Sequence, residues 1–288
     1  MSKFGNYTTF IVFDYSQIEV RMFAHMSGDK NLLKVFNSGE DIHCAVGHDL
    51  TGEPAEHFSS EHRENRTFMK ALHFAMLYGK RPKGLREQLE REGISRTIDQ
   101  VQSFYDKYFA KYPGAKRLID KLIDQASEEG FVSTIFGFKR EIMKVDDERA
   151  SFWGNQAVNS PVQGSAHQLV LIALAAIYLK PKTYWAIRDL REEVHDAIYS
   201  FTLVKNMQEA YEQGKYLLEK EVPLRVKQWF GFELKVPLIA EAKAGFRQGV
   251  LVDYKGESVS DFLDVWREKN KKIETKMRDD VKKHLTTR

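Results

Sequence analysis

Two predicted sheet segments that lie far apart in the chain constrain the fold most. The run Thr8–Phe13 is rich in β-branched and aromatic residues, so it predicts a buried strand, and it leads directly into Asp14. The alternating segment Leu190–Leu203 predicts two strands around a tight turn at His195–Asp196. Helical periodicity dominates the sequence between these segments. The patterns predict an α/β protein in which a largely helical region separates the strands of a sheet.

The rest of the chain contains further predicted helices and strands. Apolar residues at helical spacing predict helices over Gln17–His25, from Ser59 or Ser60 to Gly79, and over Leu85–Arg91, Thr97–Phe109, Ala115–Glu129 and Gln163–Leu179. Phe131–Arg140 is predicted to be a hairpin with Gly137 in or near its turn. Alternation in Phe232–Ala242 predicts another strand. An apolar stripe in Ser258–Leu285 predicts an amphipathic helix that Ser258 or Ser260 caps.

The composition excludes several classes of protein. The 288 residues carry a formal net charge of +3, with 42% hydrophobic and 30% charged residues, which excludes a disordered chain and a simple polycation. The only cysteine, Cys44, excludes an internal disulfide. The longest apolar run, Leu169–Leu179, is shorter than the about 20 residues of a spanning helix, and the N-terminus lacks a signal-peptide pattern. We therefore expect a cytoplasmic protein that does not bind a membrane. The small net charge is compatible with a local basic groove for nucleic acid.

Asp14 and Asp196 are the first candidate site residues. A single Asp at the end of a strand or in a turn usually forms the turn or caps a helix. Two carboxylates on neighbouring strands, however, repel each other unless a cation joins them. Mg²⁺ suits such a site because it takes oxygen ligands, often one or two carboxylates completed by water and phosphate. A pair of such ions is the clamp that polymerases and nucleases use.

The predicted helix that ends near Gly79 has a line of side chains with a meaningful order. Arg66, Lys70, Phe74 and Tyr78 recur at four-residue intervals, so they share one face over about 18 Å. Cations stand at one end and aromatic rings at the other, as phosphates and base do in a nucleoside triphosphate. The competing interpretation is a core helix with two snorkelling cations. The sequence of this helix alone favours neither.

Three segments together resemble the polymerase motifs of family A DNA polymerases, the DNA polymerase I type. They are DYSQIEVR from Asp14, RTFMKALHFAMLYG from Arg66, and VHD at residues 194–196. Four supporting segments lie between or after them, namely residues 41–43, Lys107–Gly114, Gly130–Arg140 and Asn159–Gly164. The resemblance covers roughly residues 8–249. It implies a palm with an antiparallel sheet (fold class α/β, or α+β) and an inserted helical fingers domain.

The resemblance implies a role for each matching residue. Asp14, Asp196 and the carbonyl of Tyr15 match the ligands of two Mg²⁺ ions. Lys70 matches a catalytic lysine that neutralises phosphate and is a candidate proton donor to the leaving pyrophosphate. The matching dNTP-binding residues are Glu19, His43, Arg66, Lys70, Phe74 and Tyr78. Within that set, Glu19 matches the steric gate that excludes a ribose, and Phe74 implies discrimination against dideoxynucleotides.

The implied DNA contacts come from other segments. Residues that match primer–template contacts are Arg21, Asn159, Gln163 and His195, with Arg21 as either a structural or a primer-side cation. The helix after Lys80–Arg86 would carry basic side chains toward template phosphate. Two positions depart from the family pattern. Ala197 stands where an acidic residue usually follows the His-Asp pair, and Asn155 stands where a basic residue is common.

The resemblance also implies a domain plan. Residues 1–30 and 151–249 are expected to form the palm, 31–150 the fingers, and 250–288 a helical C-terminal extension. No thumb or exonuclease domain is expected, so we expect a separate polypeptide to supply the thumb and the N-terminal palm. Such a split polymerase could come from a phage with an interrupted replication gene. The C-terminal helix, or an exposed sheet edge beside Thr8–Phe13, would dock that partner; the alternative for the helix is a solvated tail.

Four other interpretations compete with this one. A nuclease would use two carboxylates and Mg²⁺ but has no need of the Arg66–Tyr78 line. A single-subunit RNA polymerase would lack Glu19, because its gate must admit a ribose. A catalytically silent scaffold subunit of a replication complex would have no reason to keep Asp14, Asp196, Lys70 and Arg66 together. The chain could also be a fragment of a longer polymerase.

Overall fold

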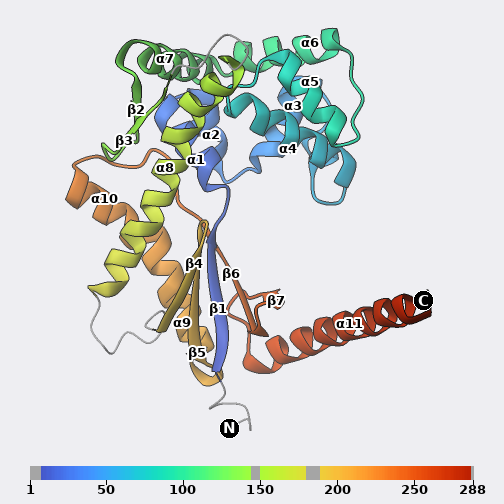
Figure 1. Ribbon diagram of the computed structural model, residues 1–288. Coiled ribbons are helices and arrows are strands. Elements are labelled where there is room, and N and C mark those ends of the chain that lie inside the picture. The colour runs from blue at the N-terminus through green and yellow to red at the C-terminus, as the bar shows by residue number, and fades with distance from the viewer. Residues whose placement is uncertain (1–7, 144–149, 180–188, 287–288) are drawn as a thin grey trace. The chain divides into compact units, whose positions relative to one another are not determined.

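The computed structural model describes residues 8–143, 150–179 and 189–286. It divides into two compact units (Figure 1). The sheet unit comprises Met1–Ser16, Leu169–Glu233 and Leu238–Arg288, and the helical unit comprises Gln17–Gln168 and Leu234–Pro237. The helical insertion therefore starts at residue 17 and ends at residue 168, whereas the expected fingers ran from 31 to 150. The assignment of palm and fingers stays a prediction.

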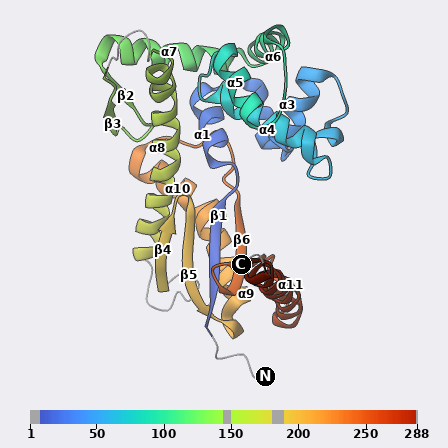
Figure 2. The same cartoon turned by 45° about the vertical axis from the view of Figure 1, so that its right-hand side comes forward.

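The sheet unit is built on a five-stranded antiparallel sheet, which confirms the expected mixed fold. The strand order is β4 (Asp189–Val194), β5 (Ala197–Leu203), β1 (Thr8–Tyr15), β6 (Ala240–Arg247) and β7 (Val250–Asp253). Figure 2 shows β4, β5, β1 and β6 side by side. The helices of this unit are α9 (Met207–Tyr216), a π-helical turn (Leu217–Glu221), α10 (Val222–Phe230) and α11 (Val259–Thr286).

Strand β1 lies in the centre of this sheet and has a different environment on each face. It pairs with β5 on one side and β6 on the other. On one face, the Phe13 ring packs so closely on Gly214 of α9 that a Cβ there would lie 2.2 Å from it. Because side chains alternate along a strand, Val12 and Asp14 point to the other face. The expected exposed edge beside Thr8–Phe13 is therefore wrong, and the edges of the sheet are β4 and β7.

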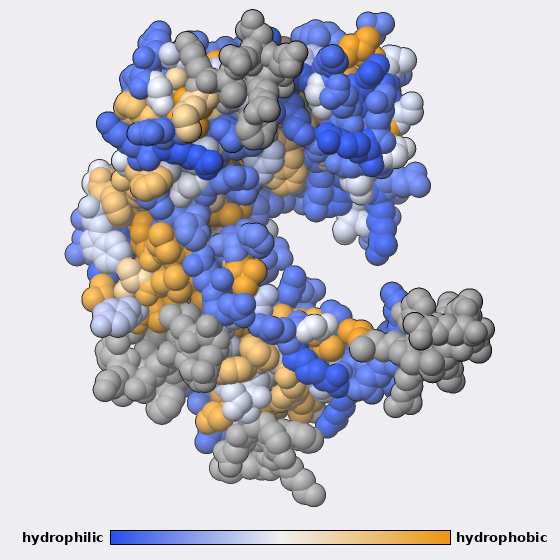
Figure 3. All heavy atoms as spheres, viewed as in Figure 1, coloured by the Kyte–Doolittle hydropathy of each residue, from blue (hydrophilic) through white to orange (hydrophobic). Residues whose placement is uncertain are grey.

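The helical unit contains most of the helices. They are α1 (Ile18–Ser27), α2 (Lys30–Ser38), α3 (Ile42–Thr51), α4 (Arg63–Leu77), α5 (Pro82–Arg91), α6 (Ile98–Lys111) and α7 (Pro113–Glu129), with a 3₁₀ turn at Ala55–Phe58. Strands β2 (Phe131–Ser133) and β3 (Lys139–Glu141) form the expected hairpin, and Gly137 in its turn has φ 85°. Helix α8 (Ala150–Tyr178) begins in this unit. The surface visible over α4, α5 and α6 in Figure 3 is mostly hydrophilic.

Local sequence signals explain where several helices start. Asp29 and Asp41 accept backbone hydrogen bonds as the N-caps of α2 and α3. Thr97 and Gln100 form a reciprocal capping box at the start of α6. Pro113 occupies the first position of α7, where its missing N–H leaves no intrahelical hydrogen bond unmade.

Three predicted boundaries are wrong for identifiable reasons. Helix α4 starts at Arg63, after Ser59 and Ser60, because the 3₁₀ turn buries Phe58 first. Helix α8 starts at residue 150 and runs through Pro161, which sequence rules place near a helix end. Residues 232–239 are not a strand. Their backbone pairs with α1 instead, since the Lys235 N–H donates to His25 at 3.1 Å and Arg21 donates to the Pro237 carbonyl at 2.8 Å.

One helix segment of the described chain, Trp153–Tyr178, is long and apolar enough to cross a membrane by length and composition. The longest uninterrupted apolar run is much shorter than this segment, because glycines and small polar residues interrupt the run. The mean hydropathy of the whole segment is nevertheless high. Of its apolar window, 61% is buried within the protein. Burial of this extent is typical of the core helix of a globular protein.

Candidate active site

Asp14 and Asp196 meet in the sheet unit. Strands β4 and β5 are joined by the two-residue turn His195–Asp196, in which His195 has φ 59°. Ala197, directly after this turn, pairs with Asp14 across β5 and β1. The register therefore carries Asp196 beside Asp14, as two separate sequence segments predicted.

The negative charge of the Asp14 carboxylate is only partly offset by its surroundings. Burial, followed by the negative charge of Asp196, raises the pKa of Asp14 to about 6, although Lys243 opposes this shift. The Oδ1 atom of Asp14 is buried and has no hydrogen-bond partner among the described residues. A cation between the two carboxylates would supply the missing partner and offset their repulsion, so the donor set fits a hard divalent ion.

The remaining predicted metal ligand, Tyr15, would contribute through its backbone. The Tyr15 hydroxyl donates to the Leu218 carbonyl at 3.1 Å in the interior of the unit, which leaves the carbonyl of Tyr15 as its candidate ligand atom. The part of the chain that the structure describes contains no group of three His, Cys, Asp or Glu residues arranged to hold a metal. A site built on two carboxylates would therefore need water and phosphate oxygens, as Mg²⁺ sites commonly do.

Asp14 opens into a cavity of about 380 Å³ on the face of the sheet opposite α9. Its lining residues are Val12, Asp14, Ala197, Tyr199, Lys243, Gln248, Gly249, Leu251, Asp253 and Lys269. Ala197, the departure from the family pattern, thus faces the cavity with a methyl group. The sequence analysis missed Glu241 and Lys243, because only the register of β1 with β6 brings them to Asp14 and Val12.

The line Arg66, Lys70, Phe74 and Tyr78 occupies the accessible face of α4. All four side chains are exposed or half-buried, whereas their neighbours from Met69 to Leu77 on the other face are buried. The rings of Phe74 and Tyr78 stack with centroids 5.9 Å apart. The core-helix interpretation therefore applies to the opposite face of α4 only.

Arg66 is already engaged by a partner that the sequence analysis did not identify. Its guanidinium makes a bidentate ion pair with Asp41, with Nη2–Oδ2 at 2.7 Å and Nη1–Oδ1 at 3.1 Å. Burial alone would favour the protonated acid, but the hydrogen bonds from Arg66 and from the Cys44 N–H lower the pKa of Asp41 to about 2. Because Asp41 is the N-cap of α3, this pair joins the start of α3 to α4.

His43 lies close to this line but is buried. Its ring centroid is 5.6 Å from that of Phe74, and its Nδ1 lies 3.4 Å from Nδ1 of His73. Burial is the main reason that its pKa falls to about 4, with the positive charges of Arg66 and Lys70 adding to the shift. The structure thus brings together His43, Arg66, Lys70 and Phe74, and at pH 7 the histidine is neutral.

Glu19 and Tyr78 form a second grouping. Tyr78, at the end of α4, donates its hydroxyl to the Glu19 carboxylate, and both side chains are half-buried. This contact fixes the carboxylate of the predicted gate next to the aromatic end of the α4 line. Arg21, two residues along α1, is only 5% exposed, donates to Pro237 and lies 4.7 Å from the Phe36 ring centre. Its burial favours the structural role of the two proposed for it.

The predicted primer–template residues Asn159 and Gln163 lie one turn apart on α8. Asn155, Asn159 and Gln163 are all exposed or half-buried, and Oδ1 of Asn159 has no hydrogen-bond partner that the structure describes. Gln163 faces a cavity of about 110 Å³ that it shares with the β2–β3 hairpin. His195 is in the other unit, within the turn beside Asp196.

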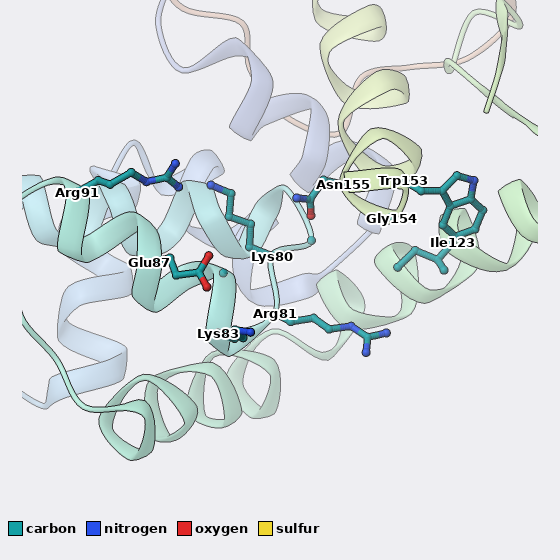
Figure 4. Close-up of a pocket in the computed structure, with 11 residues that line it drawn as sticks. Lys80, Arg81, Lys83, Glu87, Arg91, Ile123, Trp153, Gly154 and Asn155 are labelled. Atoms are coloured by element: carbon teal, nitrogen blue, oxygen red, sulfur yellow. The ribbon is translucent and has the colours of Figure 1, made fainter. Parts of the chain in front are cut away.

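A larger cavity of about 640 Å³ adjoins the turn between α4 and α5 (Figure 4). Four cations and one acid line it, namely Lys80, Arg81, Lys83, Arg91 and Glu87. Figure 4 shows Lys80 and Arg91 extending toward one another, and burial followed by the charge of Arg91 lowers the pKa of Lys80. Helix α8 adds Trp153, Gly154 and Asn155. The cavity is therefore basic even though Asn155 replaces the family's usual cation.

Comparison with known proteins agrees with these features. The model of DNA polymerase family A matches residues 2–249. DNA polymerase I of Chloroflexus aurantiacus is 34% identical over 192 residues, which are 66% of this chain and 19% of that protein. DNA polymerase I of Streptococcus pneumoniae is 31% identical over 236 residues, which are 81% of this chain and 25% of that protein. The chain thus spans about a quarter or less of the length of these relatives.

A solved structure has a similar fold. The POL domain of Pol1 from M. smegmatis, in complex with DNA primer-template and dNTP, superposes with a TM-score of 0.68 and 26% sequence identity. The match covers 84% of this chain and 40% of that one. The motif resemblance and the family model agree over nearly the same residues, and the fold match covers most of the chain. The chain belongs to DNA polymerase family A.

Proposed function

We propose that this chain carries the nucleotide-adding part of a template-directed DNA polymerase. The observation that carries the proposal is the pair Asp14 and Asp196, where a buried carboxylate oxygen of Asp14 has no hydrogen-bond partner within the described part of the chain and the pKa of Asp14 is raised. Such a pair suits a reaction between anionic reactants. The accessible face of α4 supplies a second surface with the order of groups found in a dNTP. Family membership connects these two surfaces to one reaction.

Asp14, Asp196 and the Tyr15 carbonyl would hold two Mg²⁺ ions. When bound, the ions would neutralise phosphate charge and activate the primer 3′-hydroxyl. The residues of the chain have separate tasks. The register of β1 and β5 presets the spacing of the carboxylates, and Glu241 and Lys243 on β6 adjust the charge around Asp14. His195 would contact the primer end from the same turn as Asp196.

Helix α4 would bind the incoming dNTP. Arg66 and Lys70 would bind its β- and γ-phosphates, with His43 as a neutral partner, and Lys70 would also hold a proton for the leaving pyrophosphate. The rings of Phe74 and Tyr78 would lie against the sugar and beside the template base. Glu19, held by the Tyr78 hydroxyl, would fill the space of a 2′-hydroxyl and so select deoxynucleotides.

DNA would contact further surfaces of the helical unit. Asn159 and Gln163 would contact the primer–template. The cavity at the α4–α5 turn combines four cations with Trp153, which is the combination that binds single-stranded nucleic acid through phosphate contact and stacking. We assign it to the unpaired template strand. A second polypeptide that completes the enzyme, and a location in the cytoplasm, stay predictions from the sequence.

Primer extension tests this function. The purified chain is mixed with a primed DNA template, dNTPs and Mg²⁺, beside the variants Asp14→Ala and Asp196→Ala. We expect extension, by the chain alone or once a thumb-bearing partner is added, that either substitution abolishes. A folded chain that binds primed DNA but adds no nucleotide, alone or with a thumb-bearing partner, would favour the silent scaffold subunit. Shortening of the primer in the absence of dNTPs would favour a nuclease.

A further inference from the structure

The segment that follows the family match is part of the sheet unit. The family model ends at residue 249, and strand β7 and helix α11 follow it. Strand β7 pairs with β6 and forms an edge of the sheet. Figure 1 shows α11 starting beside β7. The chain therefore adds an edge strand and a helix to the region that the family shares.

Helix α11 is anchored to this edge by buried rings and directed hydrogen bonds. Phe262 is fully buried, with its ring 5.8 Å from Tyr254 and 6.2 Å from Phe246. The Trp266 indole donates to the Val250 carbonyl at 2.8 Å, and Lys269 Nζ donates to the Leu251 carbonyl at 2.6 Å. The first half of α11 is therefore not a solvated tail, and the position of Lys269 is fixed by the fold.

The added segment forms one wall of the cavity that contains Asp14. A transverse row of paired residues crosses the cavity floor: Tyr199 on β5, Val12 on β1, Lys243 on β6 and Asp253 on β7. Leu251, Asp253 and Lys269 reach the cavity from beyond residue 249. The cavity thus runs from the carboxylate that the family supplies to a cation that the additional helix supplies.

The charges in the cavity are separated. Asp14 lies at one end, where Glu241 is its neighbour on β6 and a metal cation is expected. Lys243 lies in register with Asp253, so its charge is partly offset. Lys269 has only the uncharged Leu251 carbonyl as a hydrogen-bond partner among the described contacts, and it keeps further N–H donors. The end of the cavity remote from Asp14 is therefore the end that suits an anion.

We propose that Lys269, assisted by Lys243, binds a backbone phosphate of the primer strand, so that the segment after residue 249 extends the DNA-binding surface. This inference rests on the proposed function for the choice of strand. If the primer 3′ end lies at Asp14, the phosphates that enter the same cavity belong to the last nucleotides of the primer. Phosphate contacts of this kind position DNA without reading its sequence.

The test uses point variants, because removing the segment would expose Phe246 and the edge of β6. Lys269→Gln removes the charge but can still donate to the Leu251 carbonyl. Lys272→Gln is the matched control, since Lys272 lies on the same helix, pairs with Glu268 at 2.6 Å and does not line the cavity. Dissociation constants for primed DNA are measured without dNTPs over a range of salt concentrations. We expect Lys269→Gln to weaken binding roughly three- to tenfold and to lower the salt slope by about 0.9, and Lys272→Gln to match the wild type.

A second measurement identifies the strand. Neutral methylphosphonate linkages are placed one at a time in the last nucleotides of the primer and at the opposing template positions. At one primer position, the neutral linkage should weaken DNA binding by the wild type. The same linkage should not further weaken DNA binding by Lys269→Gln. The proposal would be overturned if Lys269→Gln kept the wild-type affinity and salt slope. It would also be overturned if the effect of Lys269→Gln depended only on neutral linkages in the template strand. Primer extension is measured in parallel, with and without a thumb-bearing partner. A Lys269-dependent slope in a chain that adds no nucleotide under either condition would support this inference and contradict the proposed function.

Discussion

At neutral pH, the folded protein without a bound metal ion disfavours the ionised form of Asp14. Its pKa is about 6 in the folded protein against 3.8 in an unfolded chain, so the folded state binds the proton more tightly. Stability from this group is therefore present below pH 4 and is lost as the pH rises through 6. A bound metal ion would stabilise the ionised carboxylate and so offset this loss of stability. This strain at one residue is typical of a site built for a ligand rather than for stability.

The first prediction concerns Asp14→Asn in metal-free protein. The amide has no charge to bury, so the melting temperature should rise at pH 7.5 and should rise clearly less at pH 4.5. Thermal unfolding at both pH values measures this. Asp253→Asn is the control, because Asp253 is exposed on the same sheet and should show no such pH-dependent gain. A variant that melts below the wild type at pH 7.5 would contradict the description of Asp14.

The second prediction concerns the Arg66–Asp41 pair. In Asp41→Asn, the side-chain oxygen can still cap α3, but the ion pair is lost. The free energy of unfolding should fall by about 1 kcal/mol at pH 7, a modest value because both side chains are partly exposed. Since the folded pKa of Asp41 is about 2 and the unfolded value is 3.8, the difference from wild type should shrink as the pH falls from about 4 to 2. Urea denaturation at pH 7, 4 and 3 measures it, and a difference independent of pH would count against the pair.

The third prediction concerns the gate. Glu19→Ala removes the side chain that Tyr78 holds, so ribonucleotide incorporation relative to deoxynucleotide should rise by roughly 10- to 100-fold. Tyr78→Phe removes only the hydroxyl donor and should cause a smaller rise. Single-nucleotide incorporation with dCTP and CTP measures the ratio. Unchanged selectivity in Glu19→Ala would remove Glu19 from this role.

At the scale of elements, the β2–β3 hairpin packs closely on α8. A Cβ on Gly164 would lie 2.8 Å from Cγ2 of the buried Thr134, whereas a Cβ on Gly154 of the same helix would meet nothing within 4 Å. Gly164→Ala should therefore destabilise the protein by about 1–3 kcal/mol through overpacking. Gly154→Ala should be neutral or stabilise it by up to about 1 kcal/mol, because Ala favours the helix. Chemical denaturation of both variants tests this, and equal effects would contradict the close approach.

The elements show which parts of the fold the sequence could predict. Strand β1 and the hairpin at His195–Asp196 were predicted correctly because short β-rich runs are bounded by turn residues. The start of α8 was missed because Pro161 usually marks a helix end, and here the helix continues through it. Residues 232–239 alternate like a strand, but their hydrogen bonds go to α1. The sequence analysis also missed α9 and α10, although α9 covers Phe13.

At the scale of the whole molecule, the candidate site could be predicted only where motifs carried it. Strand ends and helical spacing identified Asp14, Asp196 and the α4 line, and the resemblance implied roles for them that stay predictions. Glu241, Lys243 and Lys269 could not be predicted, because they reach Asp14 or its cavity only through strand register and the packing of α11. Asp41 was likewise missed as the partner of Arg66, since a contact between two helices has no local sequence signal.

The central claim is that the carboxylates of the sheet unit and the accessible face of α4 serve one template-directed reaction. It is tested most directly by single-nucleotide addition on four primed templates that differ only in the first unpaired base, with each dNTP supplied separately. We expect that only the complementary dNTP is added on each template. We also expect Asp14→Ala or Lys70→Ala to abolish or strongly reduce the addition while the variants keep the wild-type affinity for primed DNA. Addition that ignores the template base, or that survives Asp14→Ala, would contradict it.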